Sequence, residues 1–201
     1  MNVDLVGTIF AAVGYVLGSI PFGILASRLC GVQDPRHAGS KNIGFTNVLR
    51  VSGKKAGILA LIGDFGKGWL VAWMARKILL HDPWVLIVSL SVVAGHISSV
   101  FLRFRGGKGV ATGLGCVLGV NPIIGGILIC VWFVALGIWR YSSGGALAAF
   151  GVFPVIGGIM VQRLDFVVFS IFLTGMIYYR HKENLVRLAN GTENRIRFLS
   201  S

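Results

Sequence analysis

Long stretches with few or no charged side chains are the feature that most constrains how this chain can fold. They occupy residues 5–27, 56–75, 83–102, 110–139, 141–162 and 166–179. A helix needs about 20 residues to cross the hydrocarbon core of a bilayer. Only 13% of the residues are charged and 55% are hydrophobic, a balance too apolar for a soluble domain of this size. The pattern predicts an all-α, polytopic membrane protein with one domain, residues 1–201.

The fourth stretch decides how many times the chain crosses the membrane. As one helix, its 30 residues would be about 45 Å long, and Asn121-Pro122 near its middle is a natural break. Loops on the cytoplasmic side collect Lys and Arg. With seven spans the two sides carry 15 and 3 of these residues, whereas six spans give 10 and 8. We therefore expect about seven transmembrane helices, with the N-terminus outside and the C-terminus in the cytoplasm.

This topology places the polar segments in one compartment. Residues 28–55, 103–109 and 140–145 and the C-terminal tail would all face the cytoplasm. The formal net charge of +12 then reflects topology, together with attraction of anionic lipid or substrate. Nucleic acid is not an expected partner, because no basic run interleaves with exposed aromatic residues.

The segment FRFRGGKGVATG has the composition of a phosphate-binding loop. It is not a nucleotide P-loop, because Lys108 is followed by Gly109 rather than by Ser or Thr. Gly106, Gly107 and Gly109 would still let backbone N–H groups converge on an anion, and Lys108 supplies a positive charge beside the start of a helix. A flexible basic turn that only fixes the topology is the alternative interpretation.

The segment DPRHAGSKNIGFTNVLRVSGKK mixes hydroxyl, amide and basic side chains. A loop that only sets topology needs the cations alone. The small polar residues Ser40, Asn42, Thr46 and Asn47 therefore predict a structured site, in which the planar guanidinium of Arg50 could hold an anion.

His181 and Asn184 lie three positions apart, just beyond the last apolar stretch. On a helix they would share one face, and His181 is a candidate base or hydrogen-bond donor. A histidine at a membrane boundary is alternatively a packing or interfacial residue.

A few residues inside the apolar stretches also carry expectations. Asp64 and Lys67 are spaced i, i+3, which favours a structural ion pair over a role in a substrate path. A role in a substrate path is likewise the less favoured alternative for His96. Gly18 and Gly115 belong to small-residue pairs that would let helices approach closely.

Taken together, these segments resemble one family, the bacterial acyl-phosphate:glycerol-3-phosphate acyltransferases. The resemblance covers nearly the whole chain and rests on GSIPFG from Gly18, GSKNIGFTNVLR from Gly39, GHISSVFLRFRGGKGVATG from Gly95 and RHKENLVRLANGTEN from Arg180. The sequence departs from the usual family pattern at Lys41, Phe45 and Ala146.

The resemblance implies a function and a set of site residues. The reaction would move a fatty acyl group from acyl-phosphate to glycerol 3-phosphate, at the cytoplasmic side of the bacterial inner membrane, as the first step of phospholipid synthesis. Catalytic roles would fall to Ser40, His181 and Asn184, and substrate-binding roles to Asn42, Arg50, Gly106, Gly107, Lys108, Gly109 and Ser143. No cofactor, metal or protein partner is expected beyond the two substrates and membrane lipid.

An acyl-phosphate is a mixed anhydride, so the protein need only bind two phosphates, orient a hydroxyl and stabilise an oxyanion. His181 would be the general base, although a substrate phosphate could also take the proton. An acyl-enzyme on Ser40 is the less favoured route, because no carboxylate is evident that would orient the histidine.

Three rival functions have sequence requirements of their own. Acyltransferases with a His-x4-Asp motif are excluded, because no histidine here has Asp five positions later. CDP-alcohol transferases need clustered aspartates within a span, which the lone Asp64 does not supply. A membrane anion transporter remains the alternative. Charged residues within spans and a broken helix are the sequence features that would support it.

Overall fold

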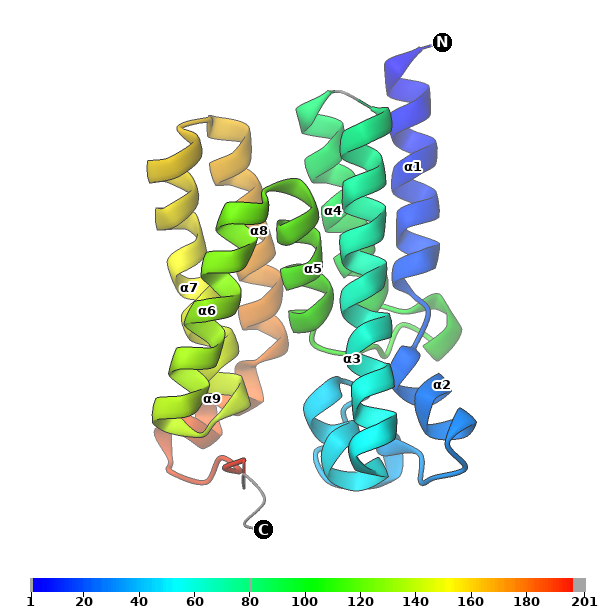
Figure 1. The fold of residues 1–201 in the computed structure, drawn as a ribbon, viewed down its shortest axis with the longest axis vertical. Coiled ribbons are helices and arrows are strands. Elements are labelled where there is room, and N and C mark those ends of the chain that lie inside the picture. Colours follow the sequence, from blue (N-terminus) through cyan, green and yellow to red (C-terminus); the bar gives the residue numbers. More distant parts are fainter. Residues whose placement is uncertain (1, 80, 197–201) are drawn as a thin grey trace. The chain divides into compact units, whose positions relative to one another are not determined.

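The computed structural model describes residues 2–79 and 81–196, and the regular elements of these residues are all helical, as expected. The α-helices are α1 (Val3–Gly18), α2 (Phe22–Leu29), α3 (Phe45–Ile78), α4 (Asp82–Ile97), α5 (Val110–Val120), α6 (Pro122–Trp139), α7 (Ser142–Val161), α8 (Leu164–Arg180) and α9 (Lys182–Ala189). Two short 3-10 helices are η1 (Pro35–His37) and η2 (Val100–Leu102) (Figure 1). The chain forms two compact units, divided after Gly125.

In the first unit, α1 lies along α4, and α3 lies along α5 (Figure 1). Glycines make this close packing possible. A methyl group at Gly18 would lie 2.1 Å from the carbonyl oxygen of Val92, and one at Gly115 would lie 2.2 Å from that of Phe65. The expected close approach of helices at these glycines is confirmed, because any larger residue would push the helices apart.

The first apolar stretch is not one straight helix. α1 ends at Gly18, and α2 begins at Phe22 after a bend of 41°. Pro21 lies in the break, where it has no amide hydrogen to continue the hydrogen-bond ladder of α1.

The segment 28–55 was expected to be a loop, and this expectation is wrong at both ends. α2 continues to Leu29, and α3 already begins at Phe45, so that only the middle is non-helical apart from η1. The helical path of α3 is kinked at Gly53, whose φ of 86° suits glycine and few other residues.

The break expected at Asn121-Pro122 is confirmed, since α5 ends at Val120 and α6 begins at Pro122. Four helices of the described residues are long and apolar enough to cross a membrane, and there are five such spans if α1 and α2 count as one. α5 has only 11 residues. The chain therefore has at least four candidate spans, and the seven-span count stays a prediction.

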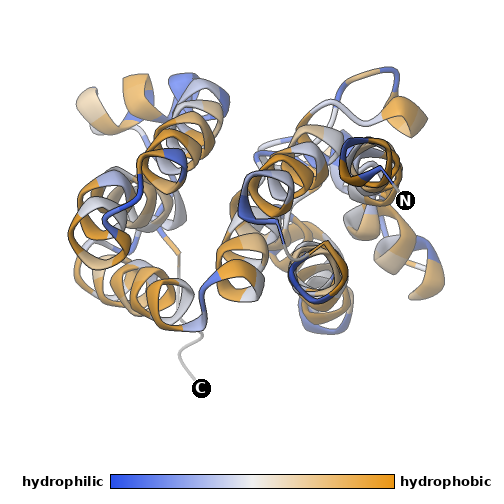
Figure 2. Cartoon of the chain, turned by 90° about the horizontal axis from the view of Figure 1, so that it is seen from above, coloured by the Kyte–Doolittle hydropathy of each residue, from blue (hydrophilic) through white to orange (hydrophobic). Residues whose placement is uncertain are grey.

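The second unit contains most of α6 together with α7, α8 and α9, and α7 packs along α8 (Figure 1). Its core is aromatic: Phe153 meets Phe150, Phe166 and Phe169 edge to face, with ring centroids 5.9 to 6.5 Å apart. The helices consist largely of hydrophobic residues, which Figure 2 shows as orange ribbon. Ile159 on α7 is 69% exposed, as expected of a side chain that lipid covers.

Candidate active site

The loop between α2 and α3 is organised around one buried side chain, Asn47. Its Oδ1 accepts a hydrogen bond from the backbone N–H of Ser40 at 2.9 Å. Its Nδ2 donates to the carbonyl oxygens of Pro35, Ala38 and Asn42 at 2.9, 3.2 and 2.8 Å. The loop therefore has a defined conformation, as its mixture of small polar residues predicted.

This arrangement leaves the predicted site residues of the loop at its surface. Ser40 is exposed, Asn42 is half-buried, and Arg50 is exposed on the first turns of α3. Lys41 has a positive φ of 56°, which turns the chain sharply after Ser40. Asn47 was expected to belong to a structured site but was given no catalytic or substrate-binding role, although it is the residue that holds this loop together.

The glycine-rich segment between η2 and α5 differs from the expected phosphate cradle in one respect. The backbone N–H groups of Gly106 and Gly107 donate to the carbonyl oxygens of Ile97 and His96, each at 3.0 Å. These two amides are thus engaged within the protein and do not point at an anion. Their hydrogen bonds instead anchor the segment to the end of α4.

The remaining part of the segment keeps the features of an anion site. Gly109 precedes α5 with a φ of 83°, so that the first amides of this helix follow directly. Lys108, which comes just before, is half-buried. The positive end of α5 and the ammonium group of Lys108 thus adjoin each other in the chain.

Asp64, Lys67 and His96 form a buried polar cluster in the first unit. Lys67 Nζ lies 2.8 Å from Asp64 Oδ1, so the expected ion pair is confirmed. Lys67 Nζ also donates to the carbonyl oxygen of Ile20 at 2.7 Å, in the break between α1 and α2. His96 Nδ1 lies 3.4 Å from the same Asp64 oxygen.

In the second unit, His181 occupies the junction of α8 and α9. Its side chain is buried, and Nδ1 lies 2.8 Å from the carbonyl oxygen of Ile177. Because a carbonyl can only accept, Nδ1 must carry the proton. In the neutral ring the lone pair is then on Nε2, the form that a general base requires.

The carboxylate of Glu193 accepts three hydrogen bonds, two from other predicted site residues of this unit and one from Arg187. Ser143 Oγ donates at 2.8 Å, Asn184 Nδ2 at 2.6 Å and Arg187 Nε at 2.7 Å. Ser143 and Asn184, 41 positions apart in the sequence, are thus brought to one carboxylate. Sequence reasoning missed Glu193, although it lies inside the motif RHKENLVRLANGTEN.

The pKa of Glu193 is lowered from its ordinary value of 4.5. Partial burial raises the pKa, but hydrogen bonds from Arg187, Ser143 and Asn184 to the ionised form outweigh this effect. Because the folded-state pKa lies below the unfolded one, the ionised carboxylate stabilises the fold above about pH 4.5. This stabilisation is lost as the pH falls through the lowered pKa.

We therefore expect Glu193→Gln to lower the melting temperature at pH 7, with a difference from the unchanged protein that shrinks below about pH 4.5. Thermal unfolding of the detergent-purified protein measures this. Glu183→Gln is the matched control, because Glu183 is exposed and lies 3.9 Å from the same Arg187. Equal effects of the two substitutions at every pH would contradict the role given to Glu193.

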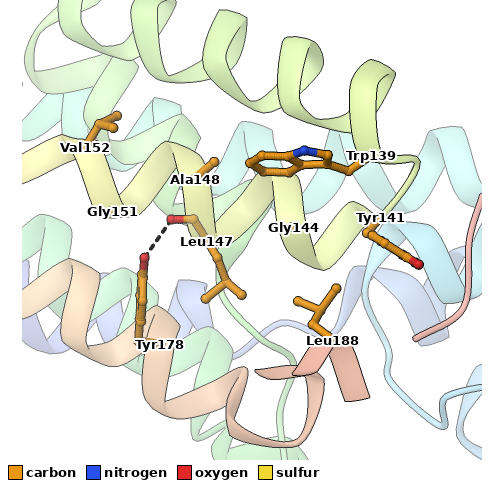
Figure 3. Close-up of a pocket in the computed structure, with 9 residues that line it drawn as sticks. All are labelled: Trp139, Tyr141, Gly144, Leu147, Ala148, Gly151, Val152, Tyr178 and Leu188. Atoms are coloured by element: carbon orange, nitrogen blue, oxygen red, sulfur yellow. Dashed lines mark hydrogen bonds between the residues drawn. The ribbon is translucent and has the colours of Figure 1, made fainter. Parts of the chain in front are cut away.

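An apolar groove of about 500 Å³ lies in the same unit, shown in Figure 3. It is lined by Trp139, Tyr141, Gly144, Leu147, Ala148, Gly151, Val152, Tyr178 and Leu188. Within this lining, Tyr178 donates its hydroxyl to the carbonyl oxygen of Leu147 at 2.9 Å. The lining residue Gly144 directly follows Ser143, which donates a hydrogen bond to Glu193. A polar cluster thus borders an apolar groove.

These features define an integral membrane protein with a polar site at one end of an apolar groove, a combination suited to an amphiphilic substrate. The sequence profile of glycerol-3-phosphate acyltransferases matches residues 8–191. The chain belongs to this family, and it is an acyltransferase.

Similar proteins support this assignment over about nine-tenths of the chain. Glycerol-3-phosphate acyltransferase of Aromatoleum aromaticum is 43% identical, with 90% of this chain and 92% of that protein covered. The enzyme of Methylobacillus flagellatus is 40% identical, with 92% and 94% covered.

Two solved structures have the same fold. The crystal structure of the integral membrane glycerol 3-phosphate acyltransferase PlsY (YgiH) in its glycerol 3-phosphate form matches with a TM-score of 0.89 at 35% identity, covering 95% of this chain and 96% of that one. Its lysophosphatidic acid form matches with a TM-score of 0.87 at 34% identity, covering 95% of each chain.

Proposed function

We propose that this protein transfers a fatty acyl group from acyl-phosphate to the hydroxyl of glycerol 3-phosphate. The products are 1-acyl-glycerol 3-phosphate and inorganic phosphate, and the reaction is the first step of phospholipid synthesis. The protein works in the bacterial inner membrane with its site toward the cytoplasm. Family membership supports the acceptor, and the solved relative in its glycerol 3-phosphate form supports it further.

The observation that carries the proposal is the polar cluster of Ser143, Asn184 and Glu193 at one end of the apolar groove. A fatty acyl donor has the matching chemistry, with a long apolar chain that ends in a polar reacting group. From Gly144 to Val152, α7 extends about 12 Å along the groove, enough for a large part of an acyl chain.

The chemistry of an acyl-phosphate explains why so few groups suffice. The glycerol hydroxyl attacks the carbonyl carbon, the C–O bond to phosphate breaks, and the hydroxyl proton must be removed. We assign this proton to Nε2 of His181, because Nδ1 donates to Ile177. Ser40, Arg50, Lys108 and the first amides of α5 are proposed to bind substrate phosphates or orient the reacting groups.

The direct route is preferred over an acyl-enzyme on Ser40. In a catalytic triad the base is oriented by a carboxylate at the nitrogen that does not take the proton. In this protein the group at Nδ1 of His181 is the backbone carbonyl of Ile177. This geometry supports a base that is held in place but does not favour activation of a serine.

One assay tests donor and reaction together. Purified protein in detergent is given glycerol 3-phosphate with either palmitoyl-phosphate or palmitoyl-CoA. We expect lysophosphatidic acid and inorganic phosphate from palmitoyl-phosphate, and little product from palmitoyl-CoA. Product from palmitoyl-CoA alone would overturn the proposed donor. Phosphate flux into sealed vesicles without product would support an anion transporter instead.

The groove makes a separate prediction. Ala148→Phe adds a ring to its lining and should raise KM for palmitoyl-phosphate more than KM for a donor with an eight-carbon chain. Kinetics with both donors measure the ratio. The control is Val155→Phe on the same helix, where the side chain is 62% exposed and does not line the groove. An equal change for both donors would place the acyl chain elsewhere.

A further inference from the structure

The cluster of Asp64, Lys67 and His96 connects three segments of the first unit. All three side chains are at most 5% exposed. Lys67 reaches the break between α1 and α2 through the carbonyl oxygen of Ile20, and Asp64 faces both Lys67 and His96. Ionisable groups in an apolar helix are costly, and they persist where they have partners and a purpose.

His96 is the member of the cluster that contacts the glycine-rich segment. Its carbonyl oxygen accepts the N–H of Gly107 at 3.0 Å. Its ring lies so close that a methyl group at Gly107 would come within 2.2 Å of Nε2. The opposite side of the ring, Nδ1, lies 3.4 Å from Asp64. The imidazole thus lies between the carboxylate of Asp64 and the backbone of Gly107.

An ion pair alone would satisfy the buried charges of Asp64 and Lys67. It does not require that a histidine lie between the pair and the segment that carries Lys108. We propose that Asp64 and His96 are positioning residues for glycerol 3-phosphate: Asp64 orients the His96 ring, and the ring fixes the backbone at residues 106–109 in its binding conformation. This inference rests on the function proposed above.

The test uses His96→Asn, which can place an amide near Asp64 but removes the part of the ring that contacts Gly107. We expect KM for glycerol 3-phosphate to rise by about 10- to 100-fold, the effect of a small misplacement of a binding group. KM for acyl-phosphate and the melting temperature should change little. The control is Ser89→Ala, an equally buried position on α4 whose hydroxyl bonds its own helix at Val85.

A double variant gives a second and independent readout. Gly107→Ala alone should raise KM for glycerol 3-phosphate, because the new methyl group collides with the His96 ring. With His96→Asn the methyl group gains space, so the two effects should be markedly less than additive. Titration calorimetry with glycerol 3-phosphate measures the same coupling as a dissociation constant, without turnover.

Each outcome decides one of the two proposals. If the unchanged protein is active but His96→Asn leaves glycerol 3-phosphate affinity intact, the inference is wrong. It is also wrong if the two substitutions are strictly additive, or if His96→Asn alters both KM values and the melting temperature in parallel. If the unchanged protein forms no lysophosphatidic acid from glycerol 3-phosphate, the proposed function fails.

Asp64→Asn, which retains an oxygen for Lys67, should also raise KM for glycerol 3-phosphate, as His96→Asn does.

Discussion

His181→Ala is expected to lower kcat by about 10² to 10⁴-fold, the usual contribution of a positioned acid or base. The ring is buried at the junction of α8 and α9, and its Nδ1 is fixed at 2.8 Å from Ile177. A substitution there removes the proposed proton acceptor. Release of inorganic phosphate under saturating substrates measures kcat.

Two further variants separate the base from other roles of the histidine. His181→Gln can still donate a hydrogen bond but cannot take a proton at neutral pH. It should therefore be as slow as His181→Ala. His81→Ala, at an exposed position between α3 and α4, should turn over normally. Should His181→Gln keep most of its kcat, the proton must pass to a substrate phosphate instead.

Asn47→Ala is expected to reduce kcat/KM by about 10² to 10³-fold, because one side chain makes four hydrogen bonds to the loop that carries Ser40. Each buried group that loses its partner costs about 1 to 3 kcal/mol. If two such losses distort the bound conformation, they amount to about 3 to 4 kcal/mol in the transition state. Steady-state kinetics with both substrates measure this effect.

The two halves of the Asn47 amide can be tested separately. Asn47→Asp retains the oxygen that accepts from Ser40 but loses the donor to Pro35, Ala38 and Asn42. Its kcat/KM should lie between that of the unchanged protein and that of Asn47→Ala, or close to the latter. Ser52→Ala is the control on the same helix, since the Ser52 hydroxyl donates to the carbonyl oxygen of Gln33, near the α2 end of the loop, and makes no hydrogen bond to Ser40. Normal kinetics of Asn47→Ala would mean that the loop has no part in the reaction.

The helical membrane class was predictable because it depends on composition along the chain. Apolar stretches of about 20 residues indicate helices that are surrounded by a lipid bilayer rather than by water. The break at Asn121-Pro122 was equally local, since proline cannot donate the hydrogen bond that a continuous helix needs. The Asp64–Lys67 pair also followed from spacing alone, because residues i and i+3 are neighbours on a helix.

The bend before α2 and the early start of α3 could not be predicted from the apolar stretches. An uncharged run shows where a helix can lie in lipid but not where its hydrogen bonds stop. Gly53 and Pro21 are the points where the backbone changes direction, and each residue also occurs within helices of membrane proteins.

The sequence by itself determined the class of protein, its family and most of the candidate residues, because these depend on residue types and short spacings. Only the tertiary structure decided what each residue touches. It placed the amides of Gly106 and Gly107 on α4 carbonyls, made Asn47 the centre of the Ser40 loop, and brought Ser143 and Asn184 to Glu193. Contacts between distant positions depend on how helices pack, and packing is a property of the whole fold rather than of any local pattern.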